Sequence, residues 1–300
     1  MNQGHWSKLT AAFCLLLVAT VSHAAVPRDS VVQTHLKYSR RVALAEPLLH
    51  SSAALVLDAT HSSVLYSRRS SVALPIASIT KLMTALVVMD AGQPLDEMLT
   101  ISADDRGFGK GSRLLPGTQL TRGDLMHLAL MASENRAAHA LGRAYPGGIG
   151  ACVEAMNAKA RELGMTSAHF VEPTGLSNQN VASPEDLSKL VMAAAKVPVI
   201  SEYSTDSAYL VQVGRRMVRF RNTDSLVSRP DWTIVVQKTG YISQAGRCLV
   251  MQTVIEDRTV VIVLLNSFGK HTRVADARRI RKWMEATLPT RQAAAVAAST

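Results

Sequence analysis

The stretch LPIASITKLMTA, residues 74–85, decides the fold prediction. After Pro75 the residues from Ser78 to about Ala91 have apolar side chains on nearly every face, which predicts a buried helix. Ser78 and Lys81 are three residues apart and therefore share one face of that helix. Burial lowers the pKa of a lysine, so the Lys81 amine could serve as a neutral base for the Ser78 hydroxyl. We expect a nucleophile here, with its own N–H near a developing oxyanion.

Two further motifs follow in the chain. Ser133 and Asn135 belong to an S-x-N motif in a break of a helical region, and the triplet Lys238, Thr239 and Gly240 follows an apolar strand. A serine hydroxyl there can relay a proton to a leaving amine, and an amide side chain can both donate to and accept from a substrate amide. The lysine and threonine of the triplet offer a cation and a hydroxyl to a carboxylate. The glycine would let a substrate backbone lie against the strand.

The three motifs are informative only together. S-x-x-K or S-x-N alone is expected by chance about once in a chain of this composition, whereas K-T-G is rarer. The serines at 78 and 133 are 55 residues apart, and 105 residues separate the second serine from Lys238. Their fixed order on suitable elements favours a serine enzyme over a set of unrelated surface residues.

The hydrophobic patterns predict strands near both chain ends and helices between them. This order predicts an α+β fold, in which an antiparallel sheet of about five strands from both chain ends is flanked by helices and a helical subdomain is inserted. Expected strands are 52–58, 63–67, 209–213, 217–221, 233–237, 249–255 and 259–265, and expected helices are 78–91, one starting at 121–124, 135–142, 149–163, 183–196 and 274–288.

Composition excludes several classes of protein. The 300 residues are 47% hydrophobic and 19% charged, which excludes a disordered chain, a collagen-like fibre and a disulfide-dense miniprotein. The formal net charge of +10 favours an anionic partner: nucleic acid, a membrane surface or an acidic polymer. The nine histidines show no H-E-x-x-H spacing, so we expect no metal site, and we expect no cofactor.

The N-terminus has the pattern of a secretory signal. An apolar stretch at 9–21 precedes Ser22-His23-Ala24, which suits cleavage after Ala24. We therefore expect a signal peptide at 1–24 and a periplasmic protein; an uncleaved membrane anchor is the alternative. Export disfavours nucleic acid as a partner and favours cell-wall polymer or anionic lipid. Cys152 and Cys248 either pair or are buried thiols, and we favour thiols.

The motifs and their surroundings resemble the low-molecular-mass penicillin-binding proteins, the serine D-Ala-D-Ala peptidases, and more closely their D-alanyl-D-alanine endopeptidase branch. The resemblance spans about residues 45–288 and includes HFVEPTGLSNQN (169–180) and QKTGYISQAGRCLVM (237–251). It implies the serine β-lactamase/D-Ala-D-Ala peptidase-like fold. The expected domains are a lead-in at 25–44, the penicillin-binding peptidase domain at 45–288 and a flexible tail at 289–300.

The resemblance also implies roles for individual residues. Ser78 would be the acylated nucleophile, Lys81 its general base and Ser133 the proton shuttle. The N–H groups of Ser78 and Tyr241 would hold the oxyanion, and Arg273 would lie near the substrate carboxylate.

The implied function is hydrolysis of D-Ala–diaminopimelate cross-links in peptidoglycan, together with D-Ala-D-Ala carboxypeptidase activity as a second expectation. Partners would be peptidoglycan and covalent β-lactam inhibitors. Only about 12 residues follow the last expected helix, and they lack an amphipathic face, so no stable membrane anchor is expected. Two alternatives stay open: a serine β-lactamase, in which Glu172 would assist deacylation, and a non-catalytic wall-binding protein on the same fold.

Overall fold

The computed structural model describes residues 46–108 and 111–287. The predicted signal peptide, the lead-in and the tail lie outside the described residues. No helix in the described ranges is both long and apolar enough to span a membrane. Cys152 and Cys248 are both free and buried, which confirms the interpretation as thiols.

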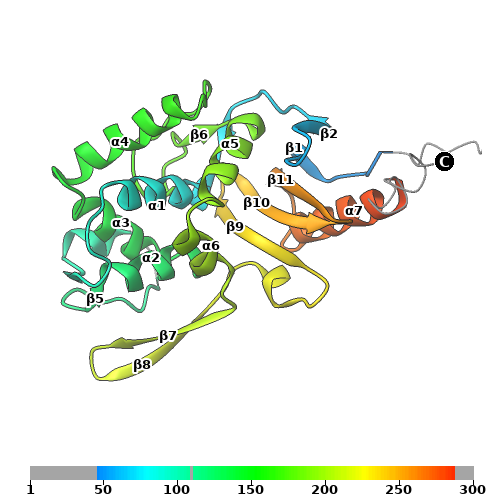
Figure 1. Cartoon of the computed structure of the whole chain (residues 1–300). Coiled ribbons are helices and arrows are strands. Elements are labelled where there is room, and N and C mark those ends of the chain that lie inside the picture. Colours follow the sequence, from blue (N-terminus) through cyan, green and yellow to red (C-terminus); the bar gives the residue numbers. More distant parts are fainter. Residues whose placement is uncertain (1–45, 109–110, 288–300) are drawn as a thin grey trace, which may run out of the picture. The chain divides into compact units, whose positions relative to one another are not determined.

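Strands from the N-terminal and the C-terminal parts of the chain form one antiparallel sheet of five strands, as predicted (Figure 1). Its order is β2-β1-β11-β10-β9. The pairing of β1 with β11 places Leu55 opposite Val263, more than 200 residues along the chain. The strands are β1 (Ser51–Asp58), β2 (Ser63–Arg68), β9 (Thr233–Ile242), β10 (Gly246–Ile255) and β11 (Arg258–Ser267).

Helices cover both faces of this sheet, which explains its uninterrupted apolar strands. In β11 the residues Val261, Val263 and Leu265 enter one hydrophobic cluster, together with α1 (Thr80–Asp90) and α5 (Pro184–Ala194). The residues between them enter a second cluster with α7 (Thr272–Thr287). Because successive side chains of a strand point to opposite faces, β11 contributes residues to the hydrophobic cores on both faces of the sheet.

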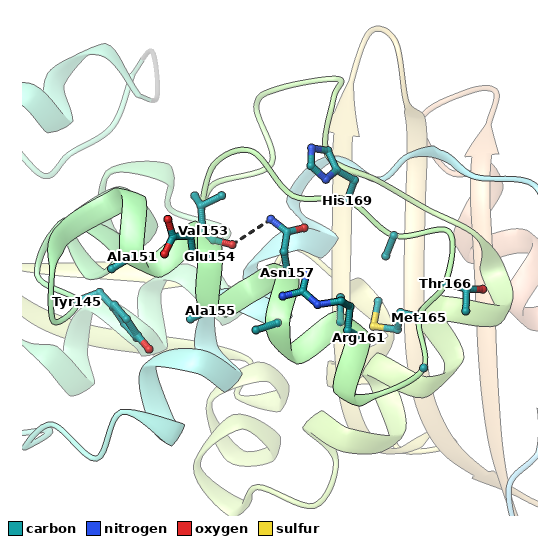
Figure 2. A pocket seen from close by; sticks show the side chains of 14 residues that line it. Tyr145, Ala151, Val153, Glu154, Ala155, Asn157, Arg161, Met165, Thr166 and His169 are labelled. Carbon is teal, nitrogen blue, oxygen red and sulfur yellow. Dashed lines mark hydrogen bonds between the residues drawn. The ribbon is translucent and has the colours of Figure 1, made fainter.

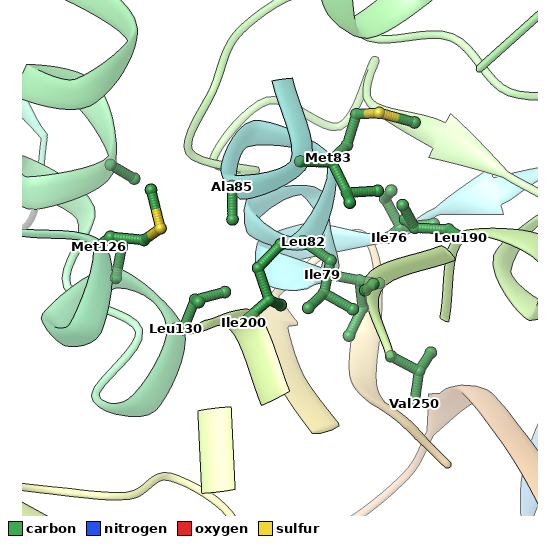
Figure 3. Close-up of a cluster of buried hydrophobic side chains, with 14 of the residues drawn as sticks. Ile76, Ile79, Leu82, Met83, Ala85, Met126, Leu130, Leu190, Ile200 and Val250 are labelled. Carbon is green, nitrogen blue, oxygen red and sulfur yellow. The ribbon is translucent and has the colours of Figure 1, made fainter. Parts of the chain in front are cut away.

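Helix α1 is the centre of the larger cluster (Figure 3). Every residue from Thr80 to Val88 is buried, so the all-round apolar pattern correctly predicted a buried helix. The helices packed around it are α2 (Arg122–Met131), α3 (Asn135–Arg143), α4 (Gly148–Glu162), α5 and α6 (Pro198–Thr205). Short 3₁₀ turns lie at Ala77–Ile79, Asp104–Gly107 and Ser225–Ser228.

The remaining strands form three separate pairs. The first is β3 (Leu74–Pro75) with β6 (Val181–Ala182), the second β4 (Met98–Thr100) with β5 (Gln119–Thr121), and the third β7 (Ala208–Val213) with β8 (Arg216–Arg221). Only the third pair was predicted. Helix α6 was not predicted, and the expected strand ended before Lys238, whereas β9 continues through the K-T-G triplet.

Candidate active site

Ser78 lies in the 3₁₀ turn that leads directly into α1. It is the second residue of that turn, so the candidate nucleophile precedes the α-helix proper rather than lying within it. The preceding residue, Ala77, has φ +49°, a left-handed conformation that is costly for a residue with a Cβ. The side chain of Ser78 keeps a small exposed area, since the residue is 9% exposed.

Lys81 connects the first motif to the second. Its Nζ lies 2.8 Å from Ser78 Oγ, 2.6 Å from Asn135 Oδ1 and 2.5 Å from the carbonyl oxygen of Thr174. A neutral amine has two hydrogens and one lone pair. When the hydrogens serve the Asn135 and Thr174 oxygens, the lone pair is left for the Ser78 hydroxyl, which can donate its proton to it.

Burial supplies the neutral form of this amine. Lys81 is 1% exposed, and desolvation lowers its pKa from 10.5 to about 7, against the opposing effect of the Glu172 and Glu134 carboxylates. A lysine with a pKa near neutrality accepts a proton at ordinary pH and returns it later in the reaction.

Ser133 occupies the turn between α2 and α3 with φ +58°. Glu134 caps α3, since its carboxylate accepts from Arg136 N at 3.3 Å. Asn135 is therefore the first residue of α3, with its amide oxygen on Lys81. Both Ser133 and Ala77 hold strained backbone, which is common where a site is fixed by the surrounding packing.

The K-T-G triplet lies in β9, the edge strand of the sheet. Lys238 is fully buried, and Nζ donates to the Thr239 carbonyl at 3.0 Å. Burial and the nearby cations Lys81 and Arg273 hold the pKa of Lys238 well below its usual value. The Thr239 hydroxyl lies 2.6 Å from the hydroxyl of Thr223.

Arg273, at the start of α7, belongs to the same charged group. Burial and Arg247 lower its pKa, and two of its guanidinium nitrogens are buried without a hydrogen-bond partner among the described residues. The carboxylate of Asp224 favours the charged forms of Arg273 and Lys238 electrostatically. Burial raises the pKa of Asp224 itself. Two basic side chains thus lie near one carboxylate, and the guanidinium nitrogens of Arg273 that lack a partner among the described residues are suited to an anionic group of a ligand.

Two comparisons identify this arrangement. Residues 40–269 match the family model for D-alanyl-D-alanine carboxypeptidase. The chain is 47% identical to the D-alanyl-D-alanine endopeptidase of Pseudomonas aeruginosa, over 79% of this chain and 78% of that one. It is 44% identical to the protein of the same name from Escherichia coli, over 84% and 83% of the two chains.

The chain belongs to the D-alanyl-D-alanine carboxypeptidase family.

Solved structures agree with this membership in the family. The Streptomyces K15 DD-transpeptidase superposes with a TM-score of 0.74 at 25% identity, covering 80% of this chain and 98% of that one. A D-alanyl-D-alanine carboxypeptidase from Mycobacterium tuberculosis gives 0.74 at 28% identity, over 81% and 94% of the two chains. The resemblance, the α+β peptidase fold and the class of serine D-Ala-D-Ala peptidase are confirmed.

Two glycines of this family member lie against the turn that carries Ser78, and only Gly240 was singled out from the sequence. A Cβ on Gly240 would lie 3.0 Å from Ala77 Cβ and 3.1 Å from Ser78 N, so a side chain here would press on the turn at Ala77 and Ser78. The expected contact of Gly240 with a substrate backbone stays a prediction. A Cβ on Gly175 would lie 2.0 Å from the Ala77 carbonyl oxygen. Gly175 also has φ +82°.

Glu172 organises the loop that carries Thr174 and Gly175. Its carboxylate accepts from Thr174 N at 2.6 Å, from Thr174 Oγ1 at 2.5 Å and from Gly175 N at 2.6 Å. Asn180 Nδ2 and Ser177 N are further donors. These five donors fill the acceptor capacity of one carboxylate, which has about four lone-pair sites, so Glu172 fixes the loop that supplies the Thr174 carbonyl to Lys81.

The other predicted residue, Tyr241, follows the triplet on the edge strand. It is 57% exposed, and its ring lies 4.5 Å from the guanidinium carbon of Arg247.

A surface cavity of about 1070 Å³ lies away from the three motifs, along α4 and the loop after it (Figure 2). Asn157, Arg161 and His169 line that cavity, and none of the motif residues does.

A buried carboxylate fastens α3. Asp105 Oδ1 lies 2.6 Å from His139 Nδ1, and Arg143 donates to Oδ2 at 3.0 Å. Arg136 adds hydrogen bonds to the carbonyls of Leu114 and Phe108. The helix that begins with Asn135 is thus held by three of its own side chains.

We predict that Asp105→Asn destabilises the fold at neutral pH by about 2 kcal/mol. Desolvation raises the pKa of Asp105, but the hydrogen bonds from His139 and Arg143 outweigh it and lower this pKa from 3.8 to about 2. A depressed folded-state pKa contributes stability above the unfolded pKa. That contribution is lost as pH falls through the folded pKa. Urea unfolding at pH 7 and near pH 2 measures this: the difference between the wild type and the variant should be large at pH 7 and small at pH 2. An equal difference at both values would contradict the assignment.

Proposed function

We propose that this family member is a periplasmic endopeptidase that hydrolyses D-Ala–diaminopimelate cross-links of peptidoglycan through an acyl-enzyme on Ser78. The carrying observation is the position of Lys81 Nζ, which lies 2.8 Å from Ser78 Oγ and within hydrogen-bond distance of the Asn135 and Thr174 oxygens. The names of the relatives in Pseudomonas aeruginosa and Escherichia coli support the endopeptidase assignment.

Acylation follows from these positions. Ser78 Oγ attacks the carbonyl carbon of the D-Ala residue while its proton passes to Lys81 Nζ. The N–H groups of Ser78 and Tyr241 stabilise the oxyanion that forms. The proton then reaches the leaving nitrogen through the Ser133 hydroxyl, and the C–N bond breaks. Water attacks the ester in the second half, with Lys81 again accepting a proton, and Ser78 is restored.

The cluster of Lys238, Thr239 and Arg273 binds the substrate carboxylate. A carboxylate on the leaving side of the scissile bond would meet Lys238, Thr239 and Arg273, whose guanidinium has two buried nitrogens without a partner among the described residues. Asn135 would share its amide between Lys81 and the substrate. Diaminopimelate carries a carboxylate beside the amine that D-Ala acylates, so the cross-link fits this group.

The two alternatives are less well supported. For a β-lactamase Glu172 would have to activate water, yet its carboxylate accepts hydrogen bonds from Thr174, Gly175, Ser177 and Asn180. For a non-catalytic wall-binding protein nothing would require Lys81 to lie 2.8 Å from Ser78 Oγ with a depressed pKa. Export by the expected signal peptide and covalent inhibition by β-lactams are parts of the same proposal.

Digestion of purified sacculi tests this proposal. The wild-type protein should convert cross-linked muropeptide dimers to monomers, as measured by chromatography of the digest. Ser78→Ala should leave the dimers intact, although the fold should lose no more than about 1–2 kcal/mol because one small side chain changes. Loss of terminal D-Ala alone, with dimers untouched, would overturn the endopeptidase assignment in favour of a carboxypeptidase.

A further inference from the structure

The hairpin of β7 and β8 has a strongly basic composition. Residues 207–223 contain no Asp or Glu and four arginines, at 215, 216, 219 and 221. All four are exposed, and within residues 46–108 and 111–287 none of them forms an ion pair. Four neighbouring cations without counter-ions on one projecting element repel each other, so their placement favours an anionic ligand.

The strand register puts part of this charge on one face. Arg221 lies opposite Ala208, Arg219 opposite Leu210, and Met217 opposite Gln212. Directly opposed residues share a face of an antiparallel pair, so Arg219 and Arg221 lie in one row. Leu210 and Met217 on the same face are 54% and 57% exposed, and they offer apolar contact beside the charges.

The row begins next to the candidate active site. Thr223, two residues after Arg221, donates from its N–H to the Met131 carbonyl at 3.1 Å, and its hydroxyl lies 2.6 Å from that of Thr239. From Arg221 through Arg219 to Met217, the residues of this face cover about 13 Å at 3.3–3.4 Å per residue, whereas Arg216 lies on the opposite face. The basic row therefore extends away from the K-T-G triplet and from α6 (Figure 1).

The base of the hairpin is fixed in place. Asn222 Nδ2 donates to the carbonyls of Ser204 and Asp206, and Gln237 Nε2 donates to Asn222 Oδ1. Tyr209 OH donates to Asp124 at 2.5 Å. On the opposite face from the row, the guanidinium of Arg113 stacks 3.8 Å from the Phe220 ring. A fixed arm presents its charges with less loss of entropy on binding.

We propose that the exposed face of β7–β8 binds the carboxylates of the polymer whose cross-link is held at Ser78, that is, the stem peptides beyond the scissile bond. This inference rests on the proposed function for the identity of the polymer. A polymer with carboxylates spaced along its peptides complements a row of guanidinium groups, and the row starts where the scissile bond lies. Substrate recognition is thereby extended beyond the Lys238 and Arg273 cluster.

The test compares two double variants with equal loss of charge, both in the Ser78→Ala background so that sacculi are not digested. The hairpin variant is Arg219→Gln, Arg221→Gln. The matched control is Arg69→Gln, Arg278→Gln, two exposed cations outside the hairpin. Binding is measured by co-sedimentation with purified sacculi at about 0.15 M ionic strength, where distant charges are screened. Thermal unfolding checks that each variant is folded.

We expect the hairpin variant to bind sacculi about tenfold more weakly and the control variant to change less than about twofold. Each exposed ion pair with a carboxylate contributes modestly, and the contributions of neighbouring pairs add. Equal weakening of both would show that overall charge governs binding, and no change in the hairpin variant would show that this face is not used; either result overturns the inference. Hairpin-dependent binding to phosphatidylglycerol vesicles without binding to sacculi would also overturn it. Because binding is measured without Ser78, failure of the catalytic proposal is seen separately, in the digestion by the wild-type protein.

Discussion

Lys81→Arg is expected to lower the rate of acylation by a β-lactam about 10³-fold or more, because a guanidinium stays protonated at usable pH and cannot accept the Ser78 proton. Arginine retains positive charge and an aliphatic stem, so the change removes the base while keeping a cation. The measurement is the rate of labelling by a fluorescent penicillin, followed on gels over time.

The pH profile of the wild-type protein is the companion measurement. Burial lowers the Lys81 pKa to about 7, so the amine is charged below that pH and neutral above it. Labelling should therefore rise with pH, tenfold per unit below about pH 7, and level off above it. A flat profile between pH 5 and pH 9, or fast labelling of the Arg variant, would contradict Lys81 as the neutral base.

Gly175→Ala is expected to reduce acylation about 100-fold, since displacement of a reacting group by about 1 Å can cost that much. The added Cβ would lie 2.0 Å from the Ala77 carbonyl oxygen and 2.8 Å from Ser78 N, both backbone atoms of the nucleophile turn. One of the two segments must move, and Ser78 moves with its own backbone. The readout is again the penicillin labelling rate, together with urea unfolding.

Gly117→Ala is the matched control for this effect. Gly117 has φ +86°, almost the same as the +82° of Gly175, but no atom of the described residues would lie within 4 Å of a Cβ at this position. Both variants therefore share the cost of a left-handed alanine, about 1–2 kcal/mol. Only Gly175→Ala adds the collision with Ala77. Equal labelling rates in the two variants would contradict the role of Gly175 in holding the nucleophile.

Local patterns were sufficient for the elements that are long or regular. The all-round apolar residues from Ile79 to Val88 predicted α1, and the β-branched runs predicted β10 and β11, because each pattern repeats over several turns or pairs. Gly214 between two runs predicted the hairpin, and it has φ +59° in the two-residue turn. Strands of two or three residues such as β3 and β4 carry no repeat, so they were missed.

Contacts between distant segments were the second feature that could not be predicted from the sequence. The pairing of Ser78 with Lys81 followed from helical spacing, but the Thr174 carbonyl that fixes Lys81 is a backbone atom, which any residue type would offer. Gly175 and Gly240 are required by the shape of the turn at Ala77, which belongs to another part of the chain. The residue types alone indicated the chemistry of the site. The packing that positions these residues depends on contacts between distant segments, which the sequence pattern does not reveal.

Mass spectrometry of the penicillin adduct tests the central claim most directly. The wild-type protein is incubated with benzylpenicillin, digested and sequenced by fragmentation, so that the added mass is assigned to one residue. We expect the adduct on Ser78 alone, the residue whose hydroxyl lies 2.8 Å from Lys81 Nζ. An adduct on another residue, or no covalent adduct in the folded protein, would contradict the assignment of Ser78 as the nucleophile.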